Sequence, residues 1–228
     1  MKLFEQKTLD QYQINDEILN LLLEHEESFD QKLTSHVWLK SDLVKRHIFN
    51  EVYSPLFKNE NLRVLDVGGG YSSITKYFSK RHDYTLLDIM AHDNHDEFQE
   101  LVKKNSIKWV KSDWYSFLPK QNYDIIIAND IFPNVDQRLE DFISKYINFT
   151  KKINLSLTYY NNGRYYKVKR VDADEILFLK ALDGKNLNYI LNQFIPIENP
   201  EIFNQNSKKS LFTNGRSVIH TNIKGKLI

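Results

Sequence analysis

A glycine cluster and the aspartate before it are the first residues whose types and spacing could bind a ligand. Asp66 lies within an apolar run, residues 64–67, that predicts a buried strand. The turn after this strand consists of Gly68, Gly69 and Gly70. Glycine suits such a turn because a Cβ would hinder both its backbone geometry and the close approach of a ligand. With Ser72 or Ser73 as the cap of a following helix, the segment would form a cradle at the carboxyl end of the strand.

A polar side chain also stands at the carboxyl end of each of the next three predicted strands. Asp88 ends a strand at residues 84–88, Asp113 and Trp114 follow a strand at 107–111, and Asn129 and Asp130 follow a strand at 123–128. In nucleotide-binding α/β folds, a carboxylate at the position of Asp88 accepts hydrogen bonds from ribose hydroxyls. The chain is therefore expected to bind a ligand that carries a ribose.

Two classes of enzyme fit a glycine turn of this kind. The fingerprint of dinucleotide-binding oxidoreductases is Gly-x-Gly-x-x-Gly, but Ser73 stands where its third glycine or alanine should be. An acidic residue inside the strand is also unusual for that family. A nicotinamide-dependent oxidoreductase stays an alternative, as does a non-catalytic domain that kept the fold.

The pattern acidic residue-x-Gly-x-Gly, beginning at Asp66, resembles the first motif of class I S-adenosylmethionine-dependent methyltransferases. The resemblance covers residues 60–222 in order. It implies S-adenosylmethionine as the cofactor, with the methionine end against the glycines, the ribose on Asp88 and the adenine amino group near Asp113. The cofactor-binding residues that it implies are Asp66, Gly68, Gly69, Gly70, Asp88, Ile89, Asp113, Trp114 and Asn129. Trp114 would flank the adenine ring or, as an equal alternative, be an ordinary core residue.

The predicted elements indicate an α/β fold with a doubly wound, mostly parallel seven-stranded sheet. Residues 1–58 would form an N-terminal helical extension over the active site, and residues 59–228 the Rossmann-like domain. Helices are expected at 14–29 (capped by Asn15), 34–53 (ended by Pro55), 73–78, 97–105, 136–146 and 172–194, the last one broken at Gly184. A fifth strand is expected at 153–159, a loop at 160–170, and a C-terminal antiparallel hairpin at 210–222 around Asn214-Gly215.

Catalysis by such an enzyme would require alignment of the acceptor with the methyl group, and a base where the acceptor is a hydroxyl. Asp130 is the first candidate for this base, and His47 or His36 is the second. His36 and His47 belong to a set on the second helix that could line the acceptor site or bind the cofactor carboxylate. The other members of this set are Trp38, Lys40 and Arg46.

No metal site is assigned. His92 and His95 lie among acids at the start of a helix, where a solvated first turn is the ordinary outcome. A magnesium site made by Asp130, Asn161 and Asn162 would need more carboxylate than these residues supply.

The acceptor is expected to be a small molecule that is anionic or nucleotide-linked. The loop after the fifth strand places cations among tyrosines, which could bind a phosphate and stack on a sugar. Its candidate substrate-binding residues are Tyr160, Arg164 and Lys167, with Lys169 and Arg170 beside them. A weak resemblance to bacterial surface-polysaccharide methyltransferases points to O-methylation of a sugar, a sugar phosphate or a phosphoramidate.

The composition limits which binding partners and which cellular compartment are expected. The 228 residues carry 31 basic and 30 acidic side chains, so no overall field favours nucleic acid or an anionic membrane. The absence of cysteine excludes disulfides and thiolate chemistry. No segment has the pattern of a signal peptide or a membrane span, so a cytoplasmic protein is expected. The sequence does not indicate an oligomeric state.

Overall fold

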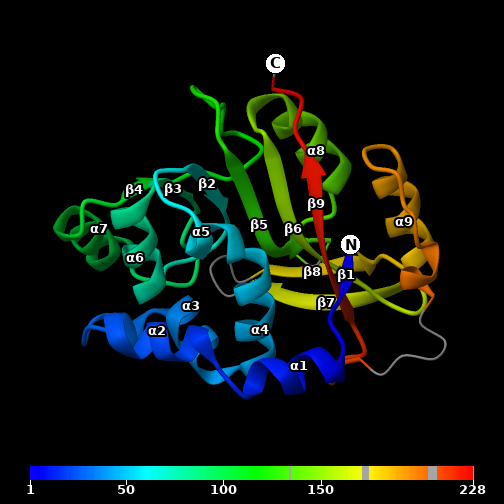
Figure 1. The fold of residues 1–228 in the computed structure, drawn as a ribbon, viewed down its shortest axis with the longest axis horizontal. Helices are drawn as coiled ribbons and strands as arrows, with labels where there is room; N and C mark the ends of the chain where they lie inside the picture. Colours follow the sequence, from blue (N-terminus) through cyan, green and yellow to red (C-terminus); the bar gives the residue numbers. More distant parts are fainter. Residues whose placement is uncertain (134, 171–174, 205–209, 228) are drawn as a thin grey trace.

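A seven-stranded sheet forms the centre of the computed structural model, which describes residues 1–133, 135–170, 175–204 and 210–227 (Figure 1). The strand order is β1-β9-β6-β5-β2-β3-β4. The strands of this sheet are β1 Lys2–Leu3, β2 Arg63–Val67, β3 Asp83–Leu87, β4 Lys108–Val110, β5 Ile125–Phe132, β6 Lys152–Tyr159 and β9 Ser217–Lys224. β9 pairs antiparallel with both of its neighbours, and all other pairs in the sheet are parallel. The predicted doubly wound, mostly parallel sheet is confirmed.

Helices cover the two faces of the sheet. The N-terminal helices are α1 Gln6–Gln13, α2 Glu17–His25, α3 Thr34–Ser41, α4 Leu43–Val52 and α5 Ser54–Lys58, and the later ones are α6 Ser73–Arg81, α7 His95–Lys104, α8 Leu139–Tyr146 and α9 Gly184–Asn192. Single turns of 3-10 helix are found at Asp30–Lys32, Ile147–Phe149 and Pro200–Phe203.

The core consists of two hydrophobic clusters, one on each face. Alternate side chains of a strand point to opposite faces, so Val64 joins the cluster under α4 and α6, while Leu65 and Val67 join the cluster under α8 and α9. The same alternation directs Asp66 toward the α4 and α6 side. An acidic side chain therefore enters the core two residues before the first glycine of the turn.

The N-terminal region contains more and shorter helices than the two that were predicted. Asp16, and not Asn15, caps α2 by accepting from the amide of Leu19. The expected helix at 34–53 is interrupted at Asp42, whose side chain caps α4. Pro55 is the second residue of α5 and does not end a helix, in keeping with the tolerance of proline in a first helical turn.

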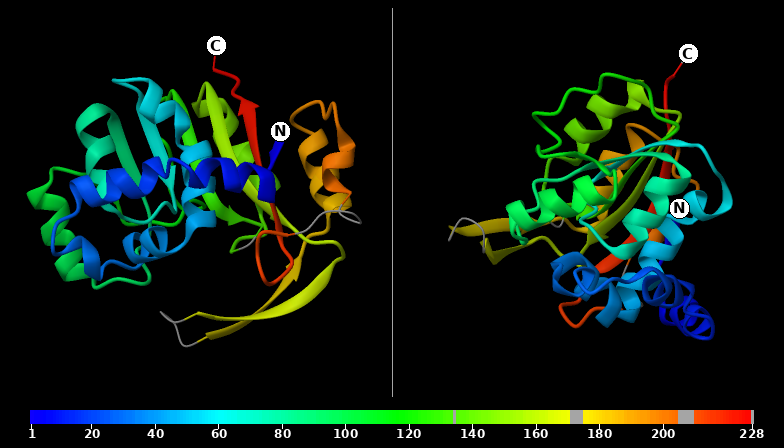
Figure 2. Two further views of the ribbon diagram at one scale, coloured as in Figure 1. Left: turned by 60° about the horizontal axis from the view of Figure 1, so that its bottom comes forward. Right: turned by 90° about the vertical axis from the view of Figure 1, so that its left-hand side faces the viewer.

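The predictions of a loop at residues 164–170 and of a helix at residues 175–181 were wrong. Residues 164–170 form strand β7 Arg164–Arg170, which pairs antiparallel with β8 Glu175–Ala181 in a separate two-stranded sheet. The helix is confirmed only as α9, and residues 171–174 lie outside the described part. An apolar run such as residues 176–179 suits a helix or a strand, and its pairing with β7 decides between them. Figure 2 shows this hairpin projecting from the body of the molecule.

The expected C-terminal hairpin is formed only in its second arm. Residues 217–224 are β9, but its partners are β6 and the N-terminal β1, and residues 210–213 are not a strand. The antiparallel hairpin of the C-terminal half is thus β7–β8. β1 has only two residues and carries no periodic signal, which is why the sequence did not predict it.

Candidate functional site

The glycine turn lies at the carboxyl end of β2 and has the geometry that requires glycine. Gly68 and Gly70 have φ angles of 62° and 63°, in the left-handed region. A Cβ on Gly69 would overlap the carboxylate of Asp66, and one on Gly70 would overlap Oγ of Ser35. The turn then leads into α6, where Ser72 forms a capping box with Thr75. The predicted strand, turn and capped helix are confirmed.

Asp66 lies beneath this turn as a buried hydrogen-bond acceptor. Both of its carboxylate oxygens are 2.9 Å from the hydroxyl of Tyr53, and the hydroxyl of Tyr84 also donates to Oδ2. The residue is only 2% exposed. Burial raises the pKa of Asp66 to about 7, although the hydrogen bonds from Tyr84 and Tyr53 act in the opposite direction. Asp66 thus supports the turn from the core side.

Asp88, at the end of β3, contacts the same turn through the backbone. Its Oδ2 accepts from the amide of Gly70 at 2.9 Å, and its Oδ1 accepts from the amide of Met90 at 2.7 Å. Burial raises the pKa of Asp88, and these two hydrogen bonds oppose that shift. Asp88, which follows β3, is therefore hydrogen-bonded directly to the glycine turn after β2.

A depression of about 710 Å³ opens beside Asp88. It is lined by Ile89, Ala91, Asp93, Asn94, His95, Asp96, Lys111, Ser112 and Asp113. Its size is within the range of small-ligand sites. Ile89 is 39% exposed and offers an apolar side chain there. Asp113 is fixed at the rim because its Oδ1 accepts from the amides of Tyr115 and Ser116. Two residues predicted for one ligand, Ile89 and Asp113, thus line the same depression.

Trp114, in contrast, is a core residue. It is 6% exposed, its ring packs edge-on against Phe132 and Phe142, and its indole nitrogen donates to Asp136 at 2.8 Å. Of the two alternatives that the sequence left open, this geometry favours the core residue over the flank of an adenine ring.

The start of α3 lies over the glycine turn, a contact that the sequence did not predict. Besides the contact of Ser35 with Gly70, the amide of Thr34 donates to Asp93 in the segment after β3 at 2.9 Å. His36 is fully buried, and its Nδ1 accepts from the amide of Ser73 at 3.3 Å. Its Nε2 then carries the proton and donates to Glu26 at 2.8 Å. His36 therefore connects α3 to the N-terminus of α6.

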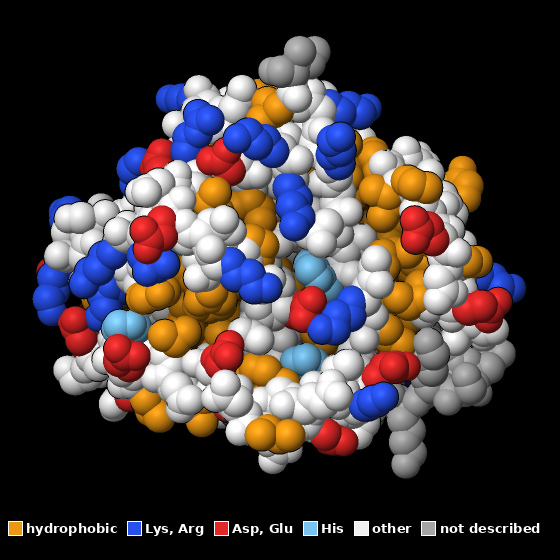
Figure 3. Space-filling model, in the orientation of Figure 1, with side chains coloured by type: hydrophobic (Ala, Val, Ile, Leu, Met, Phe, Trp, Pro, Cys, Tyr) orange, Lys and Arg blue, Asp and Glu red, His pale blue; other side chains and the backbone are white. Residues whose placement is uncertain are grey.

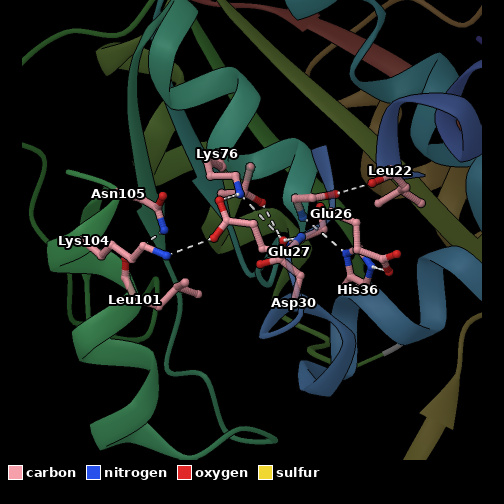
Figure 4. Close-up of polar contacts among 12 residues, drawn as sticks. Leu22, Glu26, Glu27, Asp30, His36, Lys76, Leu101, Lys104 and Asn105 are labelled. Carbon is pink, nitrogen blue, oxygen red and sulfur yellow. Dashed lines mark hydrogen bonds and ion pairs between the residues drawn. The ribbon is translucent and has the colours of Figure 1, made fainter. Parts of the chain in front are cut away.

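Charged side chains extend this connection between the N-terminal helices and α6 (Figure 4). Lys76 of α6 has a side chain that is 8% exposed and lies 2.8 Å from Glu27 and 3.8 Å from the fully buried Asp30. Lys104 of α7 reaches the other oxygen of Glu27 at 3.1 Å. These two ion pairs lower the pKa of Glu27 to about 2, mainly through the hydrogen bond from Lys76. No sequence motif marks this network, because its members come from three separate segments.

Asn129 and Asp130 lie inside β5, near its carboxyl end, and not after the strand as predicted, and they meet side chains of β6. Asn129 Oδ1 accepts from the hydroxyl of Ser156 at 2.6 Å, and the amide of Asp130 donates to the same hydroxyl at 2.8 Å. Oδ1 of Asp130 lies 3.1 Å from Nη1 of Arg216, and Oδ2 lies 3.3 Å from the same atom. The carboxylate of Asp130 is thus paired with a guanidinium, and its role as the base stays a prediction.

His47 is not brought to this site. It is 5% exposed, packs against the rings of Phe4 and Tyr12, and has Nε2 3.1 Å from Oγ1 of Thr8 in α1. Burial lowers the pKa of His47 to about 4, with Lys2 adding to the shift. Arg46 likewise joins helices, since it donates to Asp16 at 2.8 Å. Neither side chain contacts the glycine turn among the described residues.

The predicted substrate-binding residues lie around the start of the β7–β8 hairpin. The guanidinium of Arg164 lies 4.7 Å from the ring centroid of Tyr160 and donates to the carbonyl of Asn214 at 2.8 Å. Lys167 is exposed on β7, and the side chains of Lys169 and Arg170 are outside the described part. Arg164 and Tyr160 thus form a pair beside residues 212–216, whereas Lys167 stays a separate prediction.

Acidic and basic side chains both occur on the face in Figure 3, with Lys and Arg more frequent toward its top. Within the described residues, no three His, Cys, Asp or Glu side chains are grouped so that they could hold a metal ion. None of the helices among the described residues is both long and apolar enough to cross a bilayer.

Comparison with known proteins gives matches in structure only. No model of a protein family matches the chain, and no curated protein sequence does. Among solved structures, one neighbour is the 1,6-didemethyltoxoflavin-N1-methyltransferase of Burkholderia thailandensis with bound 1,6-didemethyltoxoflavin and S-adenosylhomocysteine. It is 13% identical, with a TM-score of 0.52 over 83% of this chain and 81% of the other.

Two further neighbours also contain S-adenosylhomocysteine. The N-terminal domain of EvdMO1, with S-adenosylhomocysteine and D-fucose, has a TM-score of 0.54 at 13% identity over 78% of this chain and 82% of that one. The complex of DhpI with S-adenosylhomocysteine has a TM-score of 0.50 at 13% identity over 90% and 98%. The chain therefore has the Rossmann-like fold of class I methyltransferases.

Proposed function

We propose that the chain is an S-adenosylmethionine-dependent methyltransferase that acts on a small molecule. The observation that carries the proposal is the set at the carboxyl ends of three successive strands: the glycine turn after β2, Asp88 bonded to that turn, and Asp113 after β4. The fold supports it, because structural neighbours were solved with the demethylated cofactor bound. The antiparallel β9 also favours this function over a nicotinamide-dependent oxidoreductase.

The residues present fit the proposed cofactor. Glycine is needed at the turn for backbone geometry and space, so the methionine end can lie close to the backbone there. Asp88 is held by two amides in an orientation suited to ribose hydroxyls. The depression beside it offers the side chains of Ile89 and Asp113 to the adenine. The cofactor would supply the methyl group, and Asn129 and Asp130 would orient the acceptor at the end of β5.

The N-terminal segment has the role of a cover in this proposal. Thr34 and Ser35 contact the loops that follow β3 and β2, respectively. A cover of this kind would keep water from the cofactor. Residues 1–58 would thus act as the helical extension and residues 59–228 as the methyltransferase domain.

For the acceptor, we favour a hydroxyl-bearing compound with an anionic group, such as a sugar phosphate or a phosphoramidate of surface-polysaccharide biosynthesis. Arg164 and Tyr160 support this choice, since they place a cation on an aromatic ring at the end of β6. The O-methylation of a sugar, and a cytoplasmic location of the enzyme, belong to the same proposal.

The first test is ligand-dependent melting. S-adenosylmethionine and S-adenosylhomocysteine are each expected to raise the melting temperature, because a ligand that binds only the folded state stabilises it. NAD at the same concentration is expected to have no effect. Stabilisation by NAD alone would overturn the proposal in favour of the oxidoreductase.

A further inference from the structure

Arg216 is a buried cation near the carboxyl ends of β5 and β6, where the proposed function places the methyl acceptor. No sequence motif indicated this residue. It directly precedes β9, in which Ser217 is opposite Tyr159 at the end of β6. Its side chain is 9% exposed, and only Nη1 bonds to Asp130. The side chain of its partner Asp130 is 34% exposed.

Within the described residues, no hydrogen bond to the protein is made by the other guanidinium donors of Arg216. Nε is buried without a hydrogen-bond partner, and within the described ranges every hydrogen bond of the guanidinium comes from Nη1. The Nε–H and Nη2–H bonds of a guanidinium are parallel and match two oxygens of one carboxylate or phosphate group. A buried charged donor without an acceptor is unfavourable, and such a ligand would remove that cost.

The guanidinium is held in place before any ligand binds. Its Cζ lies 3.9 Å from the ring centroid of Phe212. The backbone amide of Arg216 donates to Oδ1 of Asn214 at 3.1 Å, and its carbonyl accepts from the hydroxyl of Ser210. Asp130 fixes the Nη1 edge. Arg216 therefore needs little reorganisation to present its other edge, which favours binding.

The surrounding charge also suits an anion. Asp130 offsets one positive charge, but Arg164 is anchored to the same segment through the carbonyl of Asn214. We propose that the Nε–Nη2 edge of Arg216 binds two oxygens of a phosphate or carboxylate group on the methyl acceptor, while Asp130 holds the opposite edge. This inference rests on the proposed function only in assigning the anion to the acceptor. Asp130 then acts as a positioning residue for Arg216.

The direct test follows the arginine Nε–H signals of the ¹⁵N-labelled protein, saturated with S-adenosylhomocysteine, by NMR. Inorganic phosphate and acetate are titrated separately at constant ionic strength. One Nε–H signal, identified as Arg216 by its loss in Arg216→Lys, is expected to shift to saturation. If phosphate binds more tightly than acetate, the group on the methyl acceptor is a phosphate. If acetate binds more tightly, the group is a carboxylate. If neither anion shifts this signal, the proposal is overturned.

Variants give a second test by calorimetry. Arg216→Lys keeps the charge but loses the two-donor edge, and we expect phosphate to bind about tenfold more weakly or worse. Arg138→Lys is the matched control, because Arg138 also pairs with an aspartate, Asp136, at 2.6 Å and lies on an aromatic ring, but is exposed. It should leave phosphate binding unchanged. Equal phosphate affinity in Arg216→Lys and the wild type would refute the site.

The two proposals fail in different ways. If phosphate shifts the Arg216 signal but S-adenosylhomocysteine does not bind, the anion site holds and the methyltransferase function is wrong. If S-adenosylhomocysteine binds and no anion shifts the signal, the inference on Arg216 is wrong. Should Arg216→Lys fail to fold, the signal can be assigned by through-bond NMR and the wild-type titration still decides.

Discussion

The backbone amide of Gly70 donates a 2.9 Å hydrogen bond to Oδ2 of Asp88, which joins the turn after β2 to the end of β3. The other oxygen of Asp88 accepts from Met90 at 2.7 Å. The carboxylate is thus oriented by the protein itself, so a ribose would meet an acceptor that is already in position. Pre-organisation of this kind increases affinity by lowering the cost of ordering.

Replacement of Asp88 by Ala should therefore weaken cofactor binding. Loss of a charged acceptor for two ribose hydroxyls is expected to cost about 2 to 3 kcal/mol of binding free energy, measured by calorimetry with S-adenosylhomocysteine. Asp141→Ala, an exposed aspartate in α8, is the control and should bind normally. Unchanged affinity in Asp88→Ala would show that the ribose is not bound there.

Gly70→Ala tests the turn itself. The φ of 63° and the overlap of a Cβ with Ser35 should both destabilise the fold, the backbone strain alone by about 1 to 2 kcal/mol. Adding Ser35→Gly should recover the part that comes from the overlap, as measured by urea unfolding. Both variants should lose binding of S-adenosylhomocysteine. Normal binding in the double variant would mean that the ligand does not lie against this turn.

The sequence predicted the parts of the fold that local patterns determine. The strand that contains Asp66, the glycine turn and the helix capped by Ser72 are adjacent in sequence, and their hydrophobic period and cap chemistry identify them. Residues 164–170 were predicted as a loop and 175–181 as a helix, whereas they pair as β7 and β8. The apolar run at 176–179 suits a helix or a strand, and only cross-strand pairing selects the strand.

Long-range contacts could not be predicted from one sequence. Ser35 reaches Gly70, and Arg216 reaches Asp130 from 86 positions away, through the packing of elements that are distant in the chain. His47 looked like a candidate base because its residue type fits, but α1 buries it elsewhere. Residue type and spacing located the turn and the strand ends, whereas the three-dimensional structure was needed to pair them.

Asp66 should make stability fall as the pH rises. Its pKa is raised by burial from 3.8 to about 7 in the folded protein. Between about pH 4 and pH 7 the folded state therefore retains a proton that the unfolded state has released, and the free energy of unfolding decreases by a few kcal/mol across this window. Asp66→Asn should remove this slope in urea unfolding at several pH values. An unchanged slope would show that Asp66 titrates normally.

His47 should have the opposite effect on the pH dependence of stability. Burial lowers its pKa from 6.5 to about 4, so below pH 6.5 only the unfolded state takes up the proton. Its contribution to stability is complete above pH 6.5 and is lost as the pH falls toward 4. His47→Gln should therefore lose less stability than the wild type on going from pH 7 to pH 4. If both lose the same amount, the imidazole is not held in its neutral form.

Lys76 and Lys104 contact the same carboxylate, Glu27, but differ in burial, and this difference predicts unequal effects on stability. Lys76 has a side chain that is 8% exposed and faces the fully buried Asp30, whereas the side chain of Lys104 is 70% exposed. Lys76→Met would leave the carboxylate of Asp30 in the interior without its cation, and we expect a loss of about 3 to 5 kcal/mol in the free energy of unfolding.

Lys104→Met removes only a solvent-exposed ion pair and should cost less than about 1 kcal/mol. The double variant Lys76→Met with Asp30→Asn should recover part of the loss, because the unpaired charge is then absent. Urea unfolding at pH 7 in low and high salt measures these effects, and added salt should diminish only the contribution of Lys104, since buried pairs are little screened. Equal losses in Lys76→Met and Lys104→Met would contradict the buried charge network between α6 and the N-terminal helices.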